Sequence, residues 1–333
     1  MTGTGGSIPA GSGGGAAQAT MNDPRHIAFV CPRFAPGGTV GGAETLLRRL
    51  AECLAGTGRQ VTFLTTCAED HFTWANAREP GTEQHGPLTV RYFAVNEDRD
   101  LKAFARVQTA ISRGTQVSEA DELLWMRQNV NSRTLEAHLR EEGSRYDALV
   151  MGPYLFGLVY HAALIAPGKT YLVPCLHDEP FAYLRVMRDL FTRVRGLLFN
   201  AEPERELARR LFHLAPDRGC VVGMGMDPFE VDPEAFARRT GMTVPYVFYA
   251  GRREQGKGTP LLLDYMHAFR RRTGRDIKVV FAGKGPIEPP GELIPHVIDL
   301  GFVSEREKHE AMAGATAFIH PSVNESFGIV LLE

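Results

Sequence analysis

The chain has 333 residues, of which 44% are hydrophobic and 23% charged, so its length favours two domains and its composition is that of an ordinary globular protein. A formal net charge of −2 gives no electrostatic basis for nucleic acid as the main partner. The five cysteines have no Cys-x-x-Cys spacing and no apolar run reaches the roughly 20 residues of a spanning helix, which argues against a zinc site, a disulfide framework and a transmembrane protein.

The first segment, residues 1–22, is rich in glycine, serine and alanine. It lacks the basic start and the apolar core of a secretory signal. Side chains of these types bury too little apolar surface to offset the entropy lost on ordering. We therefore expect a disordered tail, followed by a cytoplasmic protein with reduced thiols.

A strand–loop–helix–strand unit opens the first domain. "HIAFVCP" at 26–32 is a short apolar run typical of a buried strand, and a glycine-rich loop follows it. A helix is predicted from about Ala43, because apolar residues recur at intervals of three and four until Gly56 and Gly58. "QVTFLTT" at 60–66 is the next strand, so the unit predicts a parallel sheet.

The same alternation continues to the end of the first domain, which we place at 23–226. Residues 97–142 are charged and helix-biased, and we expect an irregular excursion over the sheet there. The further elements predicted are strands at 146–152, 170–178 and 195–201, and a helix from about Tyr154.

Two loops that follow predicted strands carry unusual residues, and such loops bind ligands in parallel sheets. Gly41 and Gly42 let backbone N–H groups approach a ligand at a helix N-terminus, although a flexible turn would have the same composition. His177 and Asp178 directly follow a predicted strand, which favours a functional role over a solvated surface pair. No G-x-G-x-x-G occurs after the tail, which argues against a dinucleotide site.

The second domain, placed at 227–333, follows a last strand and a polar linker and repeats the α/β alternation. We predict a strand, a glycine loop and a helix within 246–269, strands within 276–286 and 296–303, a helix at 305–315 and a strand at 316–322. The fold class is therefore α/β, with two Rossmann-like domains facing a cleft.

"GRREQGKG" at 251–258 must be tested against the phosphate-binding loop of nucleotide hydrolases. Gly258 stands where the Ser or Thr that holds magnesium would be, so that class is not expected. Arg252 and Lys257 at a helix N-terminus still suit a diphosphate group. The alternative is two solvated cations on a loop.

"ESFGIVLLE" at 325–333 places two carboxylates with seven residues between them, and here the chain resembles a known family. The pattern resembles that of retaining nucleotide-sugar glycosyltransferases of the GT-B fold, family 4, also called glycosyltransferase group 1. Four further stretches agree in order: "GGAE" at 41–44, "HDE" at 177–179, "GMGMD" at 223–227 and "GR…GKG". The resemblance covers 26–333.

The resemblance implies a role for each candidate residue. It implies catalytic roles for His177, Arg252, Lys257 and Glu325, and donor binding by Gly41, Gly42, Arg252, Lys257, Glu325, Ser326, Phe327, Gly328 and Glu333. Glu325 would hold sugar hydroxyls and Glu333 the ribose, while Arg252 and Lys257 neutralise the diphosphate. Glu44 and Asp178 are expected on the acceptor side.

The resemblance also implies the reaction and its partners. The donor would be a nucleotide diphospho-sugar, the acceptor a glycan, a lipid-linked or a small molecule, and no metal or other cofactor would be needed. "DRD" at 98–100 matches Asp-x-Asp, but we interpret it as a solvated turn. Trp74 and Trp125 lie in 68–142, where we expect the acceptor, although buried packing would explain both.

Two further features of the sequence concern a possible membrane contact and the length of the second domain. Residues 184–198 mix arginines with apolar residues, which suits either a helix packed on the sheet or a peripheral contact with the inner face of the membrane. Residues 227–333 are fewer than the roughly 150 of a typical Rossmann-type domain, and the helix predicted from Ser326 has no stop signal, so we expect a truncated second domain.

The alternatives to a transferase are a sugar-nucleotide 2-epimerase of the same fold and an inactive nucleotide-sugar-binding fragment. A phosphorylase with pyridoxal phosphate would need a lysine such as Lys284, which matches by residue type alone.

Overall fold

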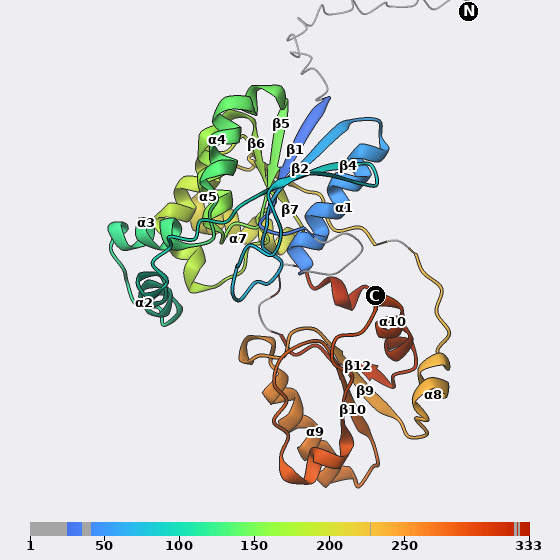
Figure 1. The fold of residues 1–333 in the computed structure, drawn as a ribbon. Coiled ribbons are helices and arrows are strands. Elements are labelled where there is room, and N and C mark those ends of the chain that lie inside the picture. The colour runs from blue at the N-terminus through green and yellow to red at the C-terminus, as the bar shows by residue number, and fades with distance from the viewer. Residues whose placement is uncertain (1–24, 35–40, 227, 323–324, 326) are drawn as a thin grey trace, which may run out of the picture.

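The computed structural model describes residues 25–34, 41–226, 228–322, 325 and 327–333. Two parallel sheets, each with helices on its faces, follow one another along the chain (Figure 1). The predicted tail at 1–22, the domain boundary at residue 227 and Ser326 lie outside the described residues.

The first sheet has eight strands in the order β3-β4-β2-β1-β5-β6-β7-β8. All neighbouring pairs are parallel except β3 and β4. The strands are β1 His26–Val30, β2 Gln60–Thr66, β3 Gly81–His85, β4 Leu88–Phe93, β5 Ala148–Met151, β6 Thr170–Leu172, β7 Gly196–Phe199 and β8 Gly219–Val221.

Helices cover both faces of this sheet (Figure 1). The α-helices are α1 Gly42–Gly56, α2 Leu101–Ser112, α3 Glu119–Gln128, α4 Arg133–Glu142, α5 Gly157–Ile165, α6 Arg185–Arg193 and α7 Glu202–Phe212. Three short 3₁₀ helices connect them: η1 Gly143–Arg145, η2 Pro167–Lys169 and η3 Pro180–Tyr183.

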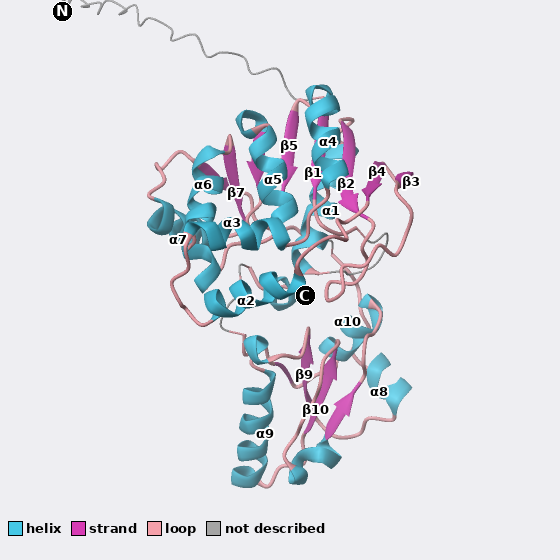
Figure 2. Cartoon of the chain, turned by 60° about the vertical axis from the view of Figure 1, so that its left-hand side comes forward, coloured by secondary structure: helices cyan, strands magenta, loops and turns pink. Residues whose placement is uncertain are grey.

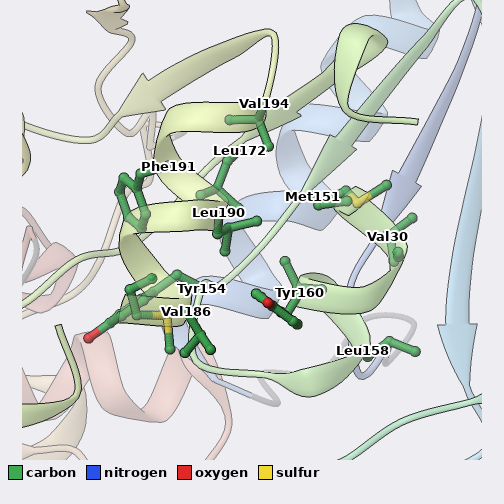
Figure 3. Packing of buried hydrophobic residues seen from close by; sticks show 14 of the residues in the cluster. Val30, Met151, Tyr154, Leu158, Tyr160, Leu172, Val186, Leu190, Phe191 and Val194 are labelled. Atoms are coloured by element: carbon green, nitrogen blue, oxygen red, sulfur yellow. The ribbon is translucent and has the colours of Figure 1, made fainter. Parts of the chain in front are cut away.

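Alternate residues of the strands divide the core into two layers, as the pleat requires. Ile27 and Phe29 of β1 pack in the layer that holds α1, whereas Ala28 and Val30 face the layer of α3–α7. Figure 3 shows the second layer, where Leu190 and Phe191 of α6 lie beside side chains of α5 and of the strands. The first domain therefore has a core on each side of its sheet.

The first-domain prediction is confirmed in its main elements, with two corrections. The antiparallel hairpin of β3 and β4 was missed, because β3 is exposed and polar and does not show the alternation of a half-buried strand. The helix predicted from Tyr154 begins at Gly157, since Tyr154 is fully buried in the turn before it.

The segment 184–198 is not one helix. Helix α6 ends at Arg193, and strand β7 begins at Gly196. The four apolar side chains of α6 are all buried against the sheet, while its arginines are exposed. The packed alternative is thus confirmed, and the apolar face of α6 is not available to a membrane.

The second sheet has four parallel strands in the order β11-β10-β9-β12. Helix α9 packs on one face, and α8 and α10 pack on the other (Figure 2). The elements are α8 Ala235–Thr240, β9 Tyr246–Ala250, η4 Gln255–Lys257, α9 Thr259–Thr273, β10 Lys278–Ala282, η5 Gly291–His296, β11 Val297–Asp299, α10 Glu305–Ala313, β12 Ala317–Phe318 and η6 Ile329–Leu331.

The helix predicted from Ser326 is wrong. The described residues there form only the 3₁₀ helix η6, which begins at Ile329. Gly328 precedes it with φ of 72°, a left-handed conformation that a right-handed α-helix does not contain. The glycine therefore separates Glu325 from η6.

The carboxyl ends of the two sheets point toward each other (Figure 2). The loops after β6, β9, β10 and β12 therefore lie on the facing sides of the two domains, where a two-domain α/β protein binds its ligand. Among the described residues no helix has the length and apolar character needed to cross a membrane.

Gly157 provides a test of how the helical excursion is joined to the sheet. A Cβ there would lie 2.3 Å from the Met126 carbonyl oxygen and 2.7 Å from the Asn131 amide. We predict that Gly157→Ala lowers the free energy of unfolding by about 1–3 kcal/mol, because buried backbone must move. Denaturant unfolding followed by tryptophan fluorescence reports on this domain, since Trp74 and Trp125 both lie in it.

Gly168→Ala is the matched control, because a Cβ at Gly168 meets nothing within 4 Å. It should change stability by no more than about 0.5 kcal/mol. Equal effects of the two substitutions would contradict the packing described for Gly157.

Candidate functional site

An ion pair joins two of the candidate residues at the carboxyl end of the second sheet. The Lys257 ammonium donates to Glu325 Oε1 at 2.5 Å. Lys257 ends η4, directly before the N-terminus of α9, whose unpaired N–H groups add partial positive charge. The structure thus brings the Glu325 carboxylate to a cation and a helix N-terminus, although Lys257 and Glu325 are 68 residues apart in the chain.

Glycine allows the backbones to approach closely enough for this pair. Gly258 has φ of 69°, and a Cβ on it would lie 2.7 Å from the Pro321 carbonyl oxygen. Gly283, after β10, would place a Cβ 2.0 Å from the carbonyl oxygen of Gly251. The loops after β9, β10 and β12 therefore meet backbone to backbone, as a compact ligand-binding edge requires.

Glu325 is held by a second donor that the sequence analysis did not select. His320 Nε2 lies 2.9 Å from Glu325 Oε1, and the imidazole stacks between Tyr249 and Phe318. Burial raises the pKa of Glu325, but the hydrogen bonds from Lys257 and His320 outweigh it and hold the pKa below its usual range. Glu325 is therefore an oriented carboxylate at neutral pH.

Neighbouring arginines have different environments. Arg252 is half-exposed, 3.4 Å from Glu254. Its charge also reaches the first domain, because burial and then the charges of Arg33 and Arg252 lower the pKa of His71. Arg253 is buried and pairs with Asp299 at 2.5 Å, so it supports the loop while Arg252 faces the space between the sheets.

The other residues predicted from the last motif lie apart from the Lys257–Glu325 pair. Phe327 and Gly328 lie in the turn between Glu325 and η6. Glu333 Oε2 lies 2.7 Å from the Lys308 ammonium on α10. The two carboxylates of the motif thus contact different elements, η4 and the loop after β12 for Glu325 and α10 for Glu333.

Gly41 and Glu44 lie at the start of α1, close to Arg33; residues 35–40 of the glycine loop are outside the described residues. Glu44 is buried and accepts from Arg33 Nη2 at 2.5 Å and Nε at 3.0 Å. A Cβ on Gly41 would lie 2.4 Å from Glu44 Oε2, whereas one on Gly42 would meet nothing. Gly41 is therefore packed against the Glu44 carboxylate, whereas Gly42, the first residue of α1, has open space around it.

His177 lies beyond strand β6, beside a hydrogen-bonded pair of polar side chains. The strand ends at Leu172, not beside His177 as predicted, because the chain turns at Cys175, whose φ is 54°. His177 Nδ1 lies 3.6 Å from Glu179 Oε1, which accepts from the hydroxyl of the buried Tyr154 at 2.8 Å. Glu179 thus lies beside the imidazole, and its carboxylate is itself fixed.

Asp178 points away from these side chains. It accepts from the Tyr183 hydroxyl at 2.6 Å and from Arg210 at 2.9 Å on the surface. The adjacent His177 and Asp178 therefore do not form a pair, and Glu179 takes the place expected for Asp178. The sequence shows Glu179 only as the last residue of "HDE".

Glu204, at the start of α7, is a buried carboxyl that the sequence analysis missed. Its two oxygens accept from the backbone N–H groups of Leu176 and Asn200, each at 2.6 Å. Burial raises the pKa of Glu204 to about 7, against the lowering effect of these N–H groups. Glu204 thus ties the residue before His177 to the end of β7. The sequence signal that could have found Glu204 is its place as the third residue of a helix that follows a strand, where a glutamate commonly accepts from free backbone N–H groups.

The acidic groups that match metal-binding patterns already have partners. Asp98 pairs with both terminal nitrogens of Arg133 at 2.8 and 2.9 Å, and Asp100 caps α2, as the solvated-turn interpretation predicts. Glu305, His309 and Glu333 are the one cluster of metal-ligating type among the described residues. The Lys308 ammonium lies within 2.9 Å of both carboxylates and occupies the cation position.

The remaining candidates from the sequence have packing contacts. Trp125 is buried and stacks on Phe104 and Phe181, which confirms the packing alternative. Trp74 is half-buried, edge-on to Phe156. Lys284 is exposed, 5.6 Å from the Phe302 ring.

The arrangement suits a ligand with a diphosphate and a polyhydroxylated group. Lys257, Arg252 and the α9 N-terminus offer positive charge, and Glu325 offers a fixed hydrogen-bond acceptor beside them. His177 lies at the carboxyl end of the opposite sheet. The cationic groups and the Glu325 carboxylate therefore lie on the second domain, and the His177 imidazole lies on the facing side of the first domain.

Comparison with known proteins gives a family match for the C-terminal part of the chain and a fold for most of it. Residues 232–333 match the family model described as Glycosyl transferases group 1. The fold matches sucrose-phosphate synthase from Thermosynechococcus elongatus, with a TM-score of 0.64 and 15% sequence identity over 92% of this chain and 77% of that one.

Two further solved structures give the same result. The glycosyltransferase WaaG, involved in lipopolysaccharide biosynthesis, matches with a TM-score of 0.57 and 14% identity over 92% of this chain and 77% of that one. The trehalose-6-phosphate synthase OtsA matches with a TM-score of 0.56 and 13% identity over 89% and 78%. No curated protein matches the chain. The fold is therefore GT-B, as predicted.

The raised pKa of Glu204 predicts a pH-dependent stability. The unfolded group titrates near 4.3 and the folded one near 7, so its stabilising contribution is complete below the unfolded pKa and is lost as pH rises through 7. Between pH 5 and 8 the wild type should lose on the order of 3 kcal/mol relative to Glu204→Gln. Chemical unfolding at a series of pH values measures this.

Glu206→Gln, on the exposed face of the same helix, is the control for the loss of a carboxylate. Its stability curve should run parallel to that of the wild type. A Glu204→Gln curve that also runs parallel would show that the burial of Glu204 has no such consequence.

Proposed function

We propose that this chain is a retaining glycosyltransferase, because residues 232–333 match the family model of glycosyl transferases group 1 and the fold is GT-B. It would move a hexose-type sugar from a nucleotide diphospho-sugar to a glycan, a lipid-linked or a small-molecule acceptor. The single observation that supports a donor site here is the Lys257–Glu325 ion pair at the N-terminus of α9.

In this proposal the donor diphosphate binds Lys257, Arg252 and the open backbone at Gly42. Lys257 is fixed by Glu325, whereas Arg252 is half-exposed and able to follow the phosphate. Glu325 accepts hydroxyl groups of the sugar, oriented by His320. Phe327 and Gly328 lie next to the sugar, and Glu333 binds the ribose after release from Lys308.

The reaction breaks the bond between the anomeric carbon and the phosphate oxygen through an oxocarbenium-like transition state. Negative charge grows on the leaving diphosphate, so fixed positive groups stabilise the transition state more than the ground state. In a retaining transfer by same-face attack, the leaving phosphate takes the proton of the acceptor hydroxyl. Removing one charged contact should cost on the order of 10²–10³ in rate.

His177 is proposed to orient the donor sugar or the acceptor hydroxyl. The Tyr154–Glu179 hydrogen bond and the Glu204–Leu176 hydrogen bond fix the backbone on both sides of it. Such rigidity suits a positioning group, because a misplacement of about 1 Å is expected to cost on the order of 10² in rate.

The names of the matched structures leave the acceptor class open. Two of them are synthases of a sugar phosphate, and one takes part in lipopolysaccharide biosynthesis. Identities of 13–15% carry the fold alone to this chain, so the acceptor must be sought in its own surface.

Thermal unfolding with nucleotides tests the donor site. We expect one of UDP, GDP and ADP, and its sugar conjugate, to raise the melting temperature by several degrees at saturation, with or without EDTA. Lys257→Met should weaken this binding about 10- to 100-fold, because a hydrogen bond from a cation to the phosphate is lost.

Lys102→Met, an exposed lysine on α2, is the control and should leave the shift unchanged. A shift that is equal in Lys257→Met and the wild type would place the nucleotide elsewhere. A cooperative melt without any nucleotide response would count against a donor site. Formation of an epimer from the donor alone would favour the epimerase alternative.

A further inference from the structure

A cavity of about 430 Å³ lies in the first domain, next to the segment that carries His177. It falls in the size range of small-molecule sites. Its walls come from the turn between α2 and α3 and from the segment between β6 and α6. The lining residues are Ile111, Gly114, Thr115, Gln116, Val117, Glu122, Asp178, Glu179, Pro180, Tyr183, Leu184 and Arg185.

The position of the cavity suits a molecule that reacts at the space between the sheets. Asp178 and Glu179 are lining residues and directly follow His177. The segment lies at the carboxyl end of β6, on the side of the first domain that faces the second (Figure 2). Helix α2, which leads into the cavity wall, also lies at this end of the domain (Figure 2).

The lining of the cavity includes an aromatic ring and polar side chains. Tyr183 is 61% exposed, and its ring is fixed because its hydroxyl donates to Asp178. A fixed, exposed aromatic face suits the C–H face of a sugar or cyclitol ring. Thr115 and Gln116, both exposed, supply hydrogen-bonding groups for hydroxyls from the other wall.

The charged side chains that line the cavity are mostly acidic, which disfavours binding of an anion. Three carboxylates and one guanidinium line the cavity. Arg185, the guanidinium, already lies 3.6 Å from Glu119, and Arg210 outside the wall pairs with Asp178. Glu179 is held by the neutral Tyr154 hydroxyl, so its negative charge is not neutralised there. A phosphate in this cavity would meet carboxylates and no uncommitted cation among the described lining residues.

Glu122 shows that the acidic wall is part of the fold. It is 4% exposed, and its Oε2 accepts from the backbone N–H of Val186 at 3.1 Å, which joins α3 to the start of α6. Burial raises the pKa of Glu122. The two walls are thereby locked together, so the cavity is preformed and not a gap between mobile loops.

We propose that this cavity binds the acceptor, and that the acceptor is a small polyhydroxylated ring, neutral or amine-bearing, without phosphate or carboxylate groups. The role as acceptor rests on the proposed transferase function; the binding of this class of molecule does not. The specificity would separate this chain from synthases that join sugars to sugar phosphates.

Saturation-transfer difference NMR on the full chain tests the binding directly, since it detects weak binding of small sugars. Matched molecules that differ only in charge are compared at one ionic strength: glucose, glucosamine and glucose 6-phosphate, then myo-inositol and its monophosphate. We expect saturation transfer to glucose, glucosamine and myo-inositol, and at least tenfold weaker binding of the two phosphates.

Two variants locate the binding. Tyr183→Ala should weaken binding of the neutral and amine-bearing molecules about three- to tenfold, because the ring face is lost. Gln116→Arg adds an uncommitted cation to the wall and should allow glucose 6-phosphate to bind. Thr82→Arg, on the exposed edge strand β3, is the control for added charge and should leave the selectivity unchanged.

Several results would overturn the proposal. They are an absence of saturation transfer to all five molecules, equal or tighter binding of the phosphates in the wild type, or binding that neither Tyr183→Ala nor Gln116→Arg alters. The nucleotide titration is measured separately on the same samples. Sugar binding without nucleotide binding would support the cavity as a sugar site and contradict the transferase function. Nucleotide binding without sugar binding would contradict the sugar site alone.

Discussion

Parallel strand pairing is the constraint on which the whole molecule depends. Parallel strands need crossover connections, so every strand of such a sheet ends at the same edge. In this chain the edges of two sheets face each other (Figure 2), and the loops that carry His177, Arg252, Lys257 and Glu325 all leave those edges. Residues that are far apart in the sequence are thereby placed on these facing edges, and two of opposite charge, Lys257 and Glu325, come close enough to form an ion pair.

Much of the fold follows from local patterns in the sequence. Short apolar runs such as His26–Val30 and Tyr246–Ala250 predict buried strands, and the helices between them give the α/β class with two domains, whereas the GT-B assignment came from the resemblance of the motifs. The exposed strand Gly81–His85 does not follow, because its pairing with β4 uses backbone groups, and its side chains have no buried face. The turn at Gly328 does not follow either, since the apolar residues after it fit a helix equally well.

The candidate site could be predicted only where the sequence pattern and the chemistry coincide. Lys257 and Glu325 were selected from separate motifs, and the structure pairs them. Glu179, Glu204 and His320 were not selected, because what marks them is burial and a partner in another element. Asp178 shows that adjacency in sequence does not make a side-chain pair, since its carboxylate contacts Tyr183 and Arg210 and not His177.

The most direct measurement is calorimetric binding of one nucleoside diphosphate and its sugar conjugate to the wild type and to Glu325→Gln. If the oriented carboxylate holds the sugar, the wild type should bind the conjugate more tightly than the diphosphate. Glu325→Gln should lose about 10- to 100-fold for the conjugate and little for the diphosphate. The control is Glu288→Gln, at an exposed position, which should bind both ligands as the wild type does. Equal losses of affinity for both ligands in Glu325→Gln, or no loss for either, would contradict the proposed donor site.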